Sequence, residues 1–221
     1  GRTYFSLNRK ALGILDFEKA IALCTQKIEN NAKDAINYYY RGWALEKLDK
    51  KTEAMQDFDQ SITLNPKHFA SYFSRAYMNY NLENYEAAAL DFKETLNLDP
   101  NNYYCCMMLA ACYLETANLN LAIIYCTQSL SLKKSEIALY LKANILSNLE
   151  KYKEAQQSYE KTYELNSEIP GLKRQISFLR HYNRLDALPS VSKWQLQSLK
   201  FHIKRYQLEI LAGKYFKRIK K

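Results

Sequence analysis

The acidic side chains that could act as a general acid and base come in two close pairs, Asp57 with Asp59 and Glu83 with Glu86. Acid–base catalysis needs such groups beside a histidine or a nucleophile, within reach of a bound substrate. Neither pair has such a neighbour in the sequence, and the helical pattern places both on faces or turns exposed to solvent. The sequence therefore predicts no catalytic residue and no enzyme.

Cysteine and histidine, which hold most transition metals in proteins, are scattered along the chain. The cysteines are Cys24, Cys105, Cys106, Cys112 and Cys126, and the histidines are His68, His181 and His202. An odd number of cysteines without a Cys-x-x-Cys pair predicts neither a zinc site nor a disulfide framework. We expect these cysteines to be small apolar residues in helix cores of a protein from a reducing compartment.

The composition is that of a folded helical protein. Of the 221 residues, 48% are hydrophobic and 25% are charged, but only 5 are Gly and 4 are Pro. So few turn-forming residues disfavour β-sandwiches, barrels and folds with glycine-rich phosphate loops, and we expect no cofactor. The longest uncharged stretches, at 100–114 and 116–132, are too short or too polar to predict a transmembrane segment.

The net charge of +9 is concentrated at one end of the chain. Residues 170–221 hold 13 Lys and Arg against two acids, Asp186 and Glu209, which gives that segment a net charge of +11. The rest of the chain therefore has a net charge of −2. The pattern indicates a nearly neutral body followed by a strongly basic segment.

Internal similarity with a period of about 34 residues organises most of the chain. Asn65-Pro66 and Asp99-Pro100 lie one period apart and fix the phase of the repeat. Alanine then recurs in register at Ala20, Ala54, Ala88, Ala122 and Ala155. Each unit has two segments of about a dozen residues with apolar positions at helical spacing, which predicts an αα-hairpin.

This pattern resembles the tetratricopeptide repeat (TPR), whose signature combines aromatic residues, small residues and a closing proline. One clear copy consists of Tyr38, Gly42, Ala54, Phe58 and Pro66, and another of Tyr72, Ala76, Tyr85, Ala88, Phe92 and Pro100. The resemblance covers residues 1–169. The first unit departs most from the pattern, with Asn8 and Lys27 at places of small residues and Ala32 at the place of the proline.

The resemblance implies an all-α fold, a right-handed α-solenoid of five TPR-like helical hairpins. Stacking is needed because one hairpin cannot bury both of its apolar faces by itself. The expected units lie near residues 1–34, 35–68, 69–102, 103–135 and 136–169.

Two further helices are expected after the repeats. Residues 170–188 contain Leu172, Ile176, Leu179, Tyr182 and Leu185 at spacings of three and four, which predicts an amphipathic capping helix over the last hairpin. Residues 189–221 contain a break at 189–192, which begins with Pro189, and then a long basic amphipathic helix expected from Lys193 to about Lys217.

In the TPR family the inner helices line a groove that binds peptides, so the resemblance implies such a groove here. The candidate groove residues are Tyr39, Trp43, Phe73, Tyr77, Tyr80, Met107 and Tyr140. They lack the Lys, Asn and Arg with which chaperone-binding relatives hold a terminal carboxylate, so we expect an apolar helix or an extended peptide instead. The alternative is that these side chains pack between hairpins or hold the chain's own C-terminal helix.

The basic end has three interpretations: a solvated helix face, a site for an acidic protein surface, or a site for RNA or an anionic membrane. The residues expected to contact an acidic surface are Lys200, Lys204, Arg205, Lys214, Lys217 and Arg218. We expect a non-enzymatic protein-interaction scaffold, a subunit of a larger assembly in the cytoplasm. Tubulin tails in a cytoskeletal or ciliary assembly are one example of an acidic partner, and nucleic acid ranks below protein.

Overall fold

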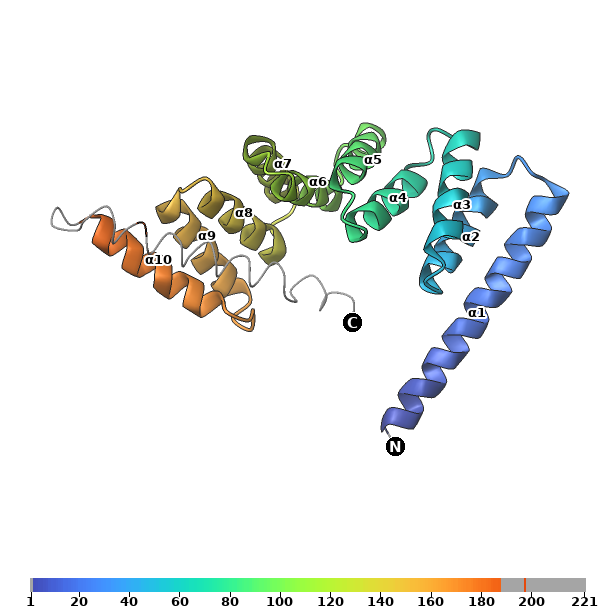
Figure 1. The fold of residues 1–221 in the computed structure, drawn as a ribbon, viewed down its shortest axis with the longest axis horizontal. Helices are drawn as coiled ribbons and strands as arrows, with labels where there is room; N and C mark the ends of the chain where they lie inside the picture. Colours follow the sequence, from blue (N-terminus) through green and yellow to red (C-terminus); the bar gives the residue numbers. More distant parts are fainter. Residues whose placement is uncertain (1, 188–196, 198–221) are drawn as a thin grey trace. The chain divides into compact units, whose positions relative to one another are not determined.

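The fold is all-α, as the sequence predicts (Figure 1). The computed structural model describes residues 2–187 and residue 197, with side chains from residue 13 onward. This part of the chain contains ten helices and no strand. The helices are α1 (Arg2–Asn30), α2 (Ala35–Lys47), α3 (Lys51–Leu64), α4 (Phe69–Asn81), α5 (Tyr85–Leu98), α6 (Tyr103–Glu115), α7 (Leu119–Leu132), α8 (Glu136–Asn148), α9 (Tyr152–Leu165) and α10 (Leu172–Asp186).

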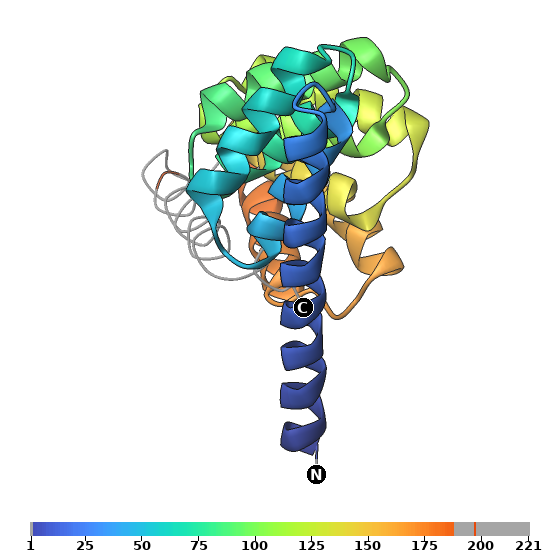
Figure 2. The ribbon, with the colours of Figure 1, turned by 90° about the vertical axis from the view of Figure 1, so that its right-hand side faces the viewer.

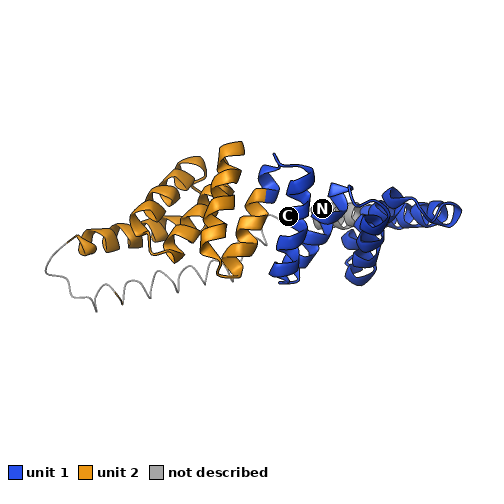
Figure 3. Cartoon of the chain, turned by 90° about the horizontal axis from the view of Figure 1, so that it is seen from above, with its two compact units in different colours: residues 1–105 blue, residues 106–221 orange. Residues whose placement is uncertain are grey.

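Helices α2 to α9 form four consecutive hairpins, each with a short turn between its two helices. Figure 3 shows that the chain divides into two compact units, residues 1–105 and residues 106–221. The boundary falls inside α6. The first unit contains α1 to α5 and the first residues of α6, and the second contains the rest of α6 with α7 to α10.

The first repeat is not a hairpin, which corrects the expectation of five. Residues 2–30 form the single helix α1, and its N-terminal part extends past the ends of α2 and α3 (Figures 1 and 2). The later hairpins have Gly or Ala at the eighth place, where the paired helices meet, whereas the first unit has Asn8. A Cβ added to Gly42 would already lie 3.0 Å from Phe58 Cε1, so an asparagine at this place opposes hairpin closure.

All four hairpins close with the same backbone turn. The residues Asp49, Glu83, Ala117 and Glu150 have φ between 58° and 64°. The amide after each of them donates to a carbonyl five residues earlier, as Lys50 N does to Leu45 O at 3.0 Å. This is the Schellman arrangement, which satisfies the last carbonyl groups of a helix and reverses the chain. The turn recurs at one place in each repeat, and it sets the register of the paired helices.

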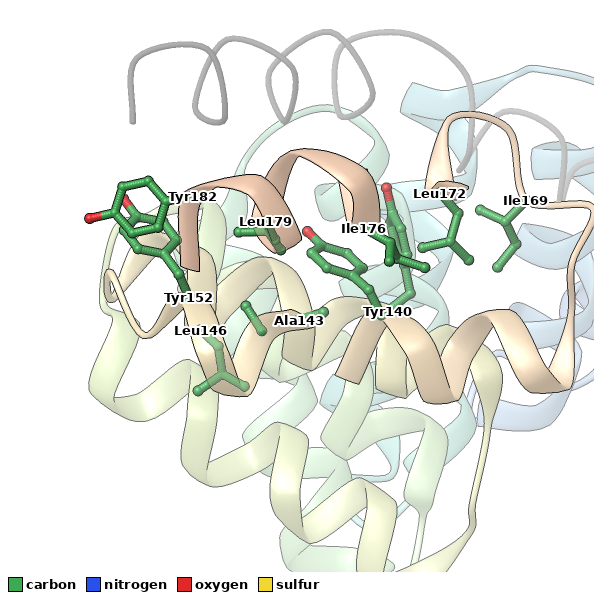
Figure 4. Packing of buried hydrophobic residues seen from close by; sticks show 11 residues of the cluster. Tyr140, Ala143, Leu146, Tyr152, Ile169, Leu172, Ile176, Leu179 and Tyr182 are labelled. Carbon is green, nitrogen blue, oxygen red and sulfur yellow. The ribbon is translucent and has the colours of Figure 1, made fainter. Parts of the chain in front are cut away.

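Each unit has its own apolar core. In the first unit, Phe58 of α3 is fully buried and packs with Leu45, Ala54 and Met78. In the second unit, α10 packs on α9 and buries Leu172, Ile176, Leu179 and Tyr182 against the last hairpin (Figure 4). Leu185, the fifth residue of the predicted stripe on α10, is partly buried.

The basic helix expected at residues 189–221 lies outside the described residues, apart from residue 197. The same holds for the six candidate contacts to an acidic surface, Lys200, Lys204, Arg205, Lys214, Lys217 and Arg218. Within the described residues, no helix has the length and apolar character needed to cross a membrane.

Candidate functional site

An open pocket of about 270 Å³ lies in the first unit, between the exposed faces of α2 and α4 and the start of α6. Its lining residues are Tyr39, Trp43, Glu46 and Lys47 from α2, Phe73, Ser74 and Tyr77 from α4, and Tyr104 from α6. Five of these eight side chains are aromatic. The pocket therefore offers several flat apolar surfaces in a small space.

The repeat explains why these aromatic side chains meet. Tyr39 and Trp43 occupy the fifth and ninth places of one repeat, and Phe73 and Tyr77 occupy the same places of the next. Residues four apart share one face of an α-helix, so each helix presents two rings on the same side. The small residue at the eighth place, Gly42 on α2, faces α3 and leaves the ring-bearing face for the pocket.

Contacts with neighbouring rings brace the aromatic side chains of the pocket. The Trp43 ring meets Phe17 of α1 edge to face, with centroids 5.5 Å apart. Phe73 contacts both the buried Phe92, at 5.9 Å, and Tyr104, at 5.8 Å. Rings held by such contacts lose little conformational entropy when a ligand binds. Trp43 nevertheless remains 40% exposed.

Glu46 and Lys47 are the two charged side chains among the lining residues. Lys47 Nζ lies 3.3 Å from Glu46 Oε1 and 5.5 Å from the centroid of the Trp43 ring. The ammonium group is thus bound by a carboxylate and an aromatic face together. Such an exposed ion pair contributes little to folding stability, so Lys47 can leave this position at low cost.

The tyrosine hydroxyl groups of the pocket stay protonated at neutral pH. Burial raises the pKa of Tyr104 to about 12. It also raises the pKa of Tyr39 and of Tyr77, and the negative charge of Glu46 adds to both shifts. These hydroxyls are therefore neutral donors and acceptors, and the negative charge of the lining is that of Glu46.

Four of the seven predicted groove residues meet in this pocket: Tyr39, Trp43, Phe73 and Tyr77. Tyr80 does not line it and instead contacts the ring of Tyr85 at 5.3 Å. Met107 and Tyr140 belong to the second unit and are buried, with 4% and 3% of their surfaces exposed. The structure thus gives these two side chains interior positions.

The pocket also has residues that the predicted set lacks. Tyr104 stands at the second place of its repeat, an inner place, so its position in the sequence could have identified it. Glu46 lies three residues after Trp43, at the twelfth place, and the same reasoning applies. Lys47 stands at the thirteenth place, also an inner place, and four residues after Trp43 on the same helix, so its position carried the same signal. Ser74, at the sixth place, carried none.

The acidic side chains considered for catalysis are engaged elsewhere or exposed. Asp57 is buried, which corrects the expectation of a solvent-exposed position, and it accepts two hydrogen bonds from the guanidinium group of Arg41, at 2.8 and 2.7 Å. Asp59 pairs with Arg75 at 2.6 Å. Glu83, in the turn between α4 and α5, and Glu86, in the first turn of α5, are exposed. Within the described residues, no group of three His, Cys, Asp or Glu side chains could hold a metal ion.

All five cysteine side chains are buried. Burial raises the pKa of the Cys126 thiol to about 12, which keeps it protonated and weakly reactive. The cysteines therefore contribute to packing in this structure.

Four antiparallel helix pairs, repeated at one register and closed by one type of turn, define an α-helical repeat protein of the kind that forms interaction scaffolds. Models of the tetratricopeptide repeat match residues 35–68, 69–102, 103–136 and 137–169. These matches cover more than half of the chain. The chain therefore belongs to the tetratricopeptide repeat family. Repeats of this family are generally non-catalytic protein-interaction modules.

Solved structures support the fold. The MamA RS-1 ArsTM double mutant matches with a TM-score of 0.67 and 17% identity, over 75% of this chain and 94% of that one. YrrB, a TPR protein with an unusual peptide-binding site, matches with a TM-score of 0.66 and 18% identity, over 85% of this chain and 91% of that one. MamA 41-end from Desulfovibrio magneticus RS-1 matches with a TM-score of 0.66 and 18% identity, over 76% of this chain and 96% of that one. No curated protein sequence matches the chain.

Proposed function

We propose that this chain is a scaffold that binds a segment of a partner protein in the aromatic pocket between α2 and α4. The observation that carries the proposal is the exposed ring of Trp43, held at the rim of a pocket with four further aromatic walls. Tryptophan and tyrosine in such pockets provide much of the binding energy at protein interfaces. A partner side chain that covers Trp43 removes apolar surface from water at a small entropic cost, because the ring is already braced.

The shape and chemistry of the pocket favour a side chain of an extended segment over a chain terminus. Capture of a terminal carboxylate needs several cationic or amide donors around one point. Lys47 is the one cation of the lining, and Glu46 neutralises it at 3.3 Å. The pocket is therefore suited to an internal segment that inserts one side chain between the rings.

The basic end adds a second part to the proposal, which is based on the charge of the sequence alone. Residues 170–221 have a net charge of +11, and we propose that they contact an acidic surface of a protein partner. The acidic tails of tubulin, in a cytoskeletal or ciliary assembly within the cytoplasm, are one such surface. Binding of RNA or an anionic membrane through the same residues is the alternative.

Selection of peptides from a random library on the full chain tests the pocket. The selected peptides are labelled, and their dissociation constants are measured by fluorescence anisotropy on the wild type, on Trp43→Ala and on Tyr77→Ala. We expect each substitution to weaken binding by at least about fivefold, as truncation of an aromatic anchor does.

Phe69→Ala is the matched control, because Phe69 is also exposed, at 48%, and lies on α4 outside the pocket lining. Its peptide affinity should equal that of the wild type. Circular dichroism checks that all variants keep their helices. If Trp43→Ala and Tyr77→Ala bind every selected peptide as tightly as Phe69→Ala does, the pocket is not the binding site.

A further inference from the structure

The pocket holds a cation in this structure, and that cation comes from the chain itself. Lys47 Nζ lies 5.5 Å from the centroid of the Trp43 ring and 3.3 Å from Glu46 Oε1. Aromatic faces attract cations through the negative potential of the ring, and tryptophan does so most strongly. The local arrangement is thus that of a cation-binding site whose present occupant is an exposed, weakly held lysine.

The remaining lining residues would serve a larger cation as well. Tyr39 and Tyr77 come from neighbouring helices, and both hydroxyls lie close enough to Glu46 for its charge to raise their pKa. As neutral hydroxyls they can accept hydrogen bonds beside the carboxylate. A flat group with several N–H donors would find aromatic faces on its sides and acceptors at its edge.

From these contacts we propose that the pocket is a recognition site for an arginine side chain of the partner segment, with the guanidinium group displacing Lys47. The guanidinium group would stack on Trp43 and donate hydrogen bonds to the Glu46 carboxylate. Arginine suits this arrangement better than lysine, because its planar fork can stack and donate two parallel hydrogen bonds at once. The inference rests on the proposed function and adds the chemistry of the side chain that is recognised.

The charges of Glu46 and Lys47 predict opposite effects of two neighbouring substitutions. Glu46→Gln removes the counter-charge and should weaken arginine binding by about tenfold or more, as loss of a charge-assisted hydrogen bond does. Lys47→Gln removes the competing cation and should tighten binding severalfold. An acidic ligand would give the reverse pattern, and a purely apolar ligand would respond little to either change.

The probes are N-acetyl-arginine amide and N-acetyl-citrulline amide, titrated into the full ¹⁵N-labelled chain. Citrulline has nearly the same shape as arginine but is neutral, so the pair isolates the charge. The readout is the indole N–H signal of Trp43, identified by its loss in Trp43→Phe. We expect the arginine probe to shift this signal with saturation, and the citrulline probe to shift it at least about tenfold more weakly.

Two matched variants control for net charge. Glu53→Gln and Lys67→Gln change exposed charges of the same unit that do not line the pocket. Both should bind the arginine probe as the wild type does. Equal shifts with arginine and citrulline, or no shift with either, would overturn the proposal, and so would a Lys47→Gln variant that binds arginine more weakly.

The peptides selected on the full chain separate this inference from the proposed function. If their binding depends on Trp43 and Tyr77 and they share an arginine that cannot be replaced by citrulline, both hold. If their binding depends on the two rings but survives replacement of every arginine, the scaffold function stands and the arginine site is wrong. If their binding depends on neither ring, both are wrong.

Discussion

At the scale of single residues, hydrogen bonds between arginine and aspartate side chains join the helices of the first unit. Arg75 donates two hydrogen bonds to Asp91, at 2.8 and 2.7 Å, and a third to Asp59 of the preceding repeat, at 2.6 Å. The pair Arg41 and Asp57 has the same geometry one repeat earlier. These bonds tie helices within and between repeats and hold the two ring-bearing helices in place.

We predict that Asp91→Asn lowers the free energy of unfolding by about 2–3 kcal/mol, because Asp91 is buried and loss of its carboxylate leaves part of the guanidinium group without an acceptor. Urea denaturation of the full chain measures the change. Glu86→Gln, an exposed change on the same helix, should stay within about 0.5 kcal/mol of the wild type. Equal midpoints for the two variants would contradict the assigned role of Asp91.

His68 belongs to a second network of hydrogen bonds in the first unit. Its Nδ1 lies 2.7 Å from Ser71 Oγ, which donates to Ser61 Oγ, and that hydroxyl donates to Ala35 O. Since the Ser71 proton is used, Nδ1 must carry the hydrogen, and protonation of the other ring nitrogen leaves this chain of hydrogen bonds intact.

Burial lowers the pKa of His68 below its ordinary value of 6.5. The unfolded chain therefore binds a proton more readily than the folded chain, and stability should fall as the pH drops below about 6.5. We predict that His68→Asn loses less stability between pH 7 and pH 5.5 than the wild type does. Urea midpoints at the two pH values give the comparison, and an equal loss in both proteins would rule out a contribution from His68.

At the scale of helices and turns, the alanine register explains how the hairpins pack. Ala88 is fully buried, whereas its neighbour Ala87 on the same helix is exposed. We predict that Ala88→Leu lowers the free energy of unfolding by about 1–3 kcal/mol through overpacking, while Ala87→Leu changes it by less than about 0.5 kcal/mol. Thermal melts followed by circular dichroism should separate the two variants, and coinciding melts would count against close packing at this place.

The turns between paired helices place a residue other than glycine in the left-handed backbone conformation, which is unfavourable for a residue with a Cβ atom. Ala117 has φ of 58°, a conformation that glycine adopts more easily than alanine. We predict that Ala117→Gly raises the free energy of unfolding by about 0.5–1 kcal/mol, whereas a glycine at the helical Ala87 lowers it by a similar amount. A destabilised Ala117→Gly variant in urea denaturation would be inconsistent with the Schellman turn.

The sequence predicted these hairpins well because their period, small residues and turn positions are local features. The prediction was wrong at α1, where the period continues but residues 2–30 form one helix. Asn8 stands at the place where the later hairpins have Gly or Ala, and the close contact of Gly42 with Phe58 leaves little room for a larger residue there. A register of apolar residues is therefore not sufficient, because closure of a hairpin also needs space between its two helices.

The candidate site was predicted in part, for a similar reason. Tyr39, Trp43, Phe73 and Tyr77 follow from the repeat, because the same places of neighbouring helices face one side. Lys47 lies four residues after Trp43 on the same face of α2, but the prediction selects only aromatic side chains and Met107 as groove residues. The burial of Met107 and Tyr140 depends on the tertiary packing of the second unit.

At the scale of the whole molecule, charge and aromatic surface are separated along the chain. The aromatic pocket belongs to the first unit, whereas the net charge of +11 belongs to residues 170–221. An arginine ligand and an acidic surface are chemically opposite partners. The two sites can therefore be tested separately in one protein, since their ligands do not compete for the same groups.

We predict that reversal of Lys204, Arg205, Lys217 and Arg218 to Glu abolishes a salt-sensitive part of binding to an acidic partner. The probe is a labelled polyglutamate peptide, measured by anisotropy on the full chain. Attraction between exposed charges is screened beyond about 8–10 Å at physiological salt, so wild-type affinity should fall steeply as salt is added. The quadruple variant should bind weakly at every salt concentration and keep its affinity for peptides of the aromatic pocket.

The matched control reverses Lys67, Lys133, Lys134 and Lys161, which are exposed and lie on the repeats. It changes the net charge by the same amount, so it should bind polyglutamate more weakly only to the extent that total charge matters. Equal losses in the two quadruple variants would mean that the basic end has no specific role. Competition by RNA or by anionic vesicles at lower concentrations than polyglutamate would favour the alternative partner, because binding to a polyanion of high charge density is driven by release of its counterions.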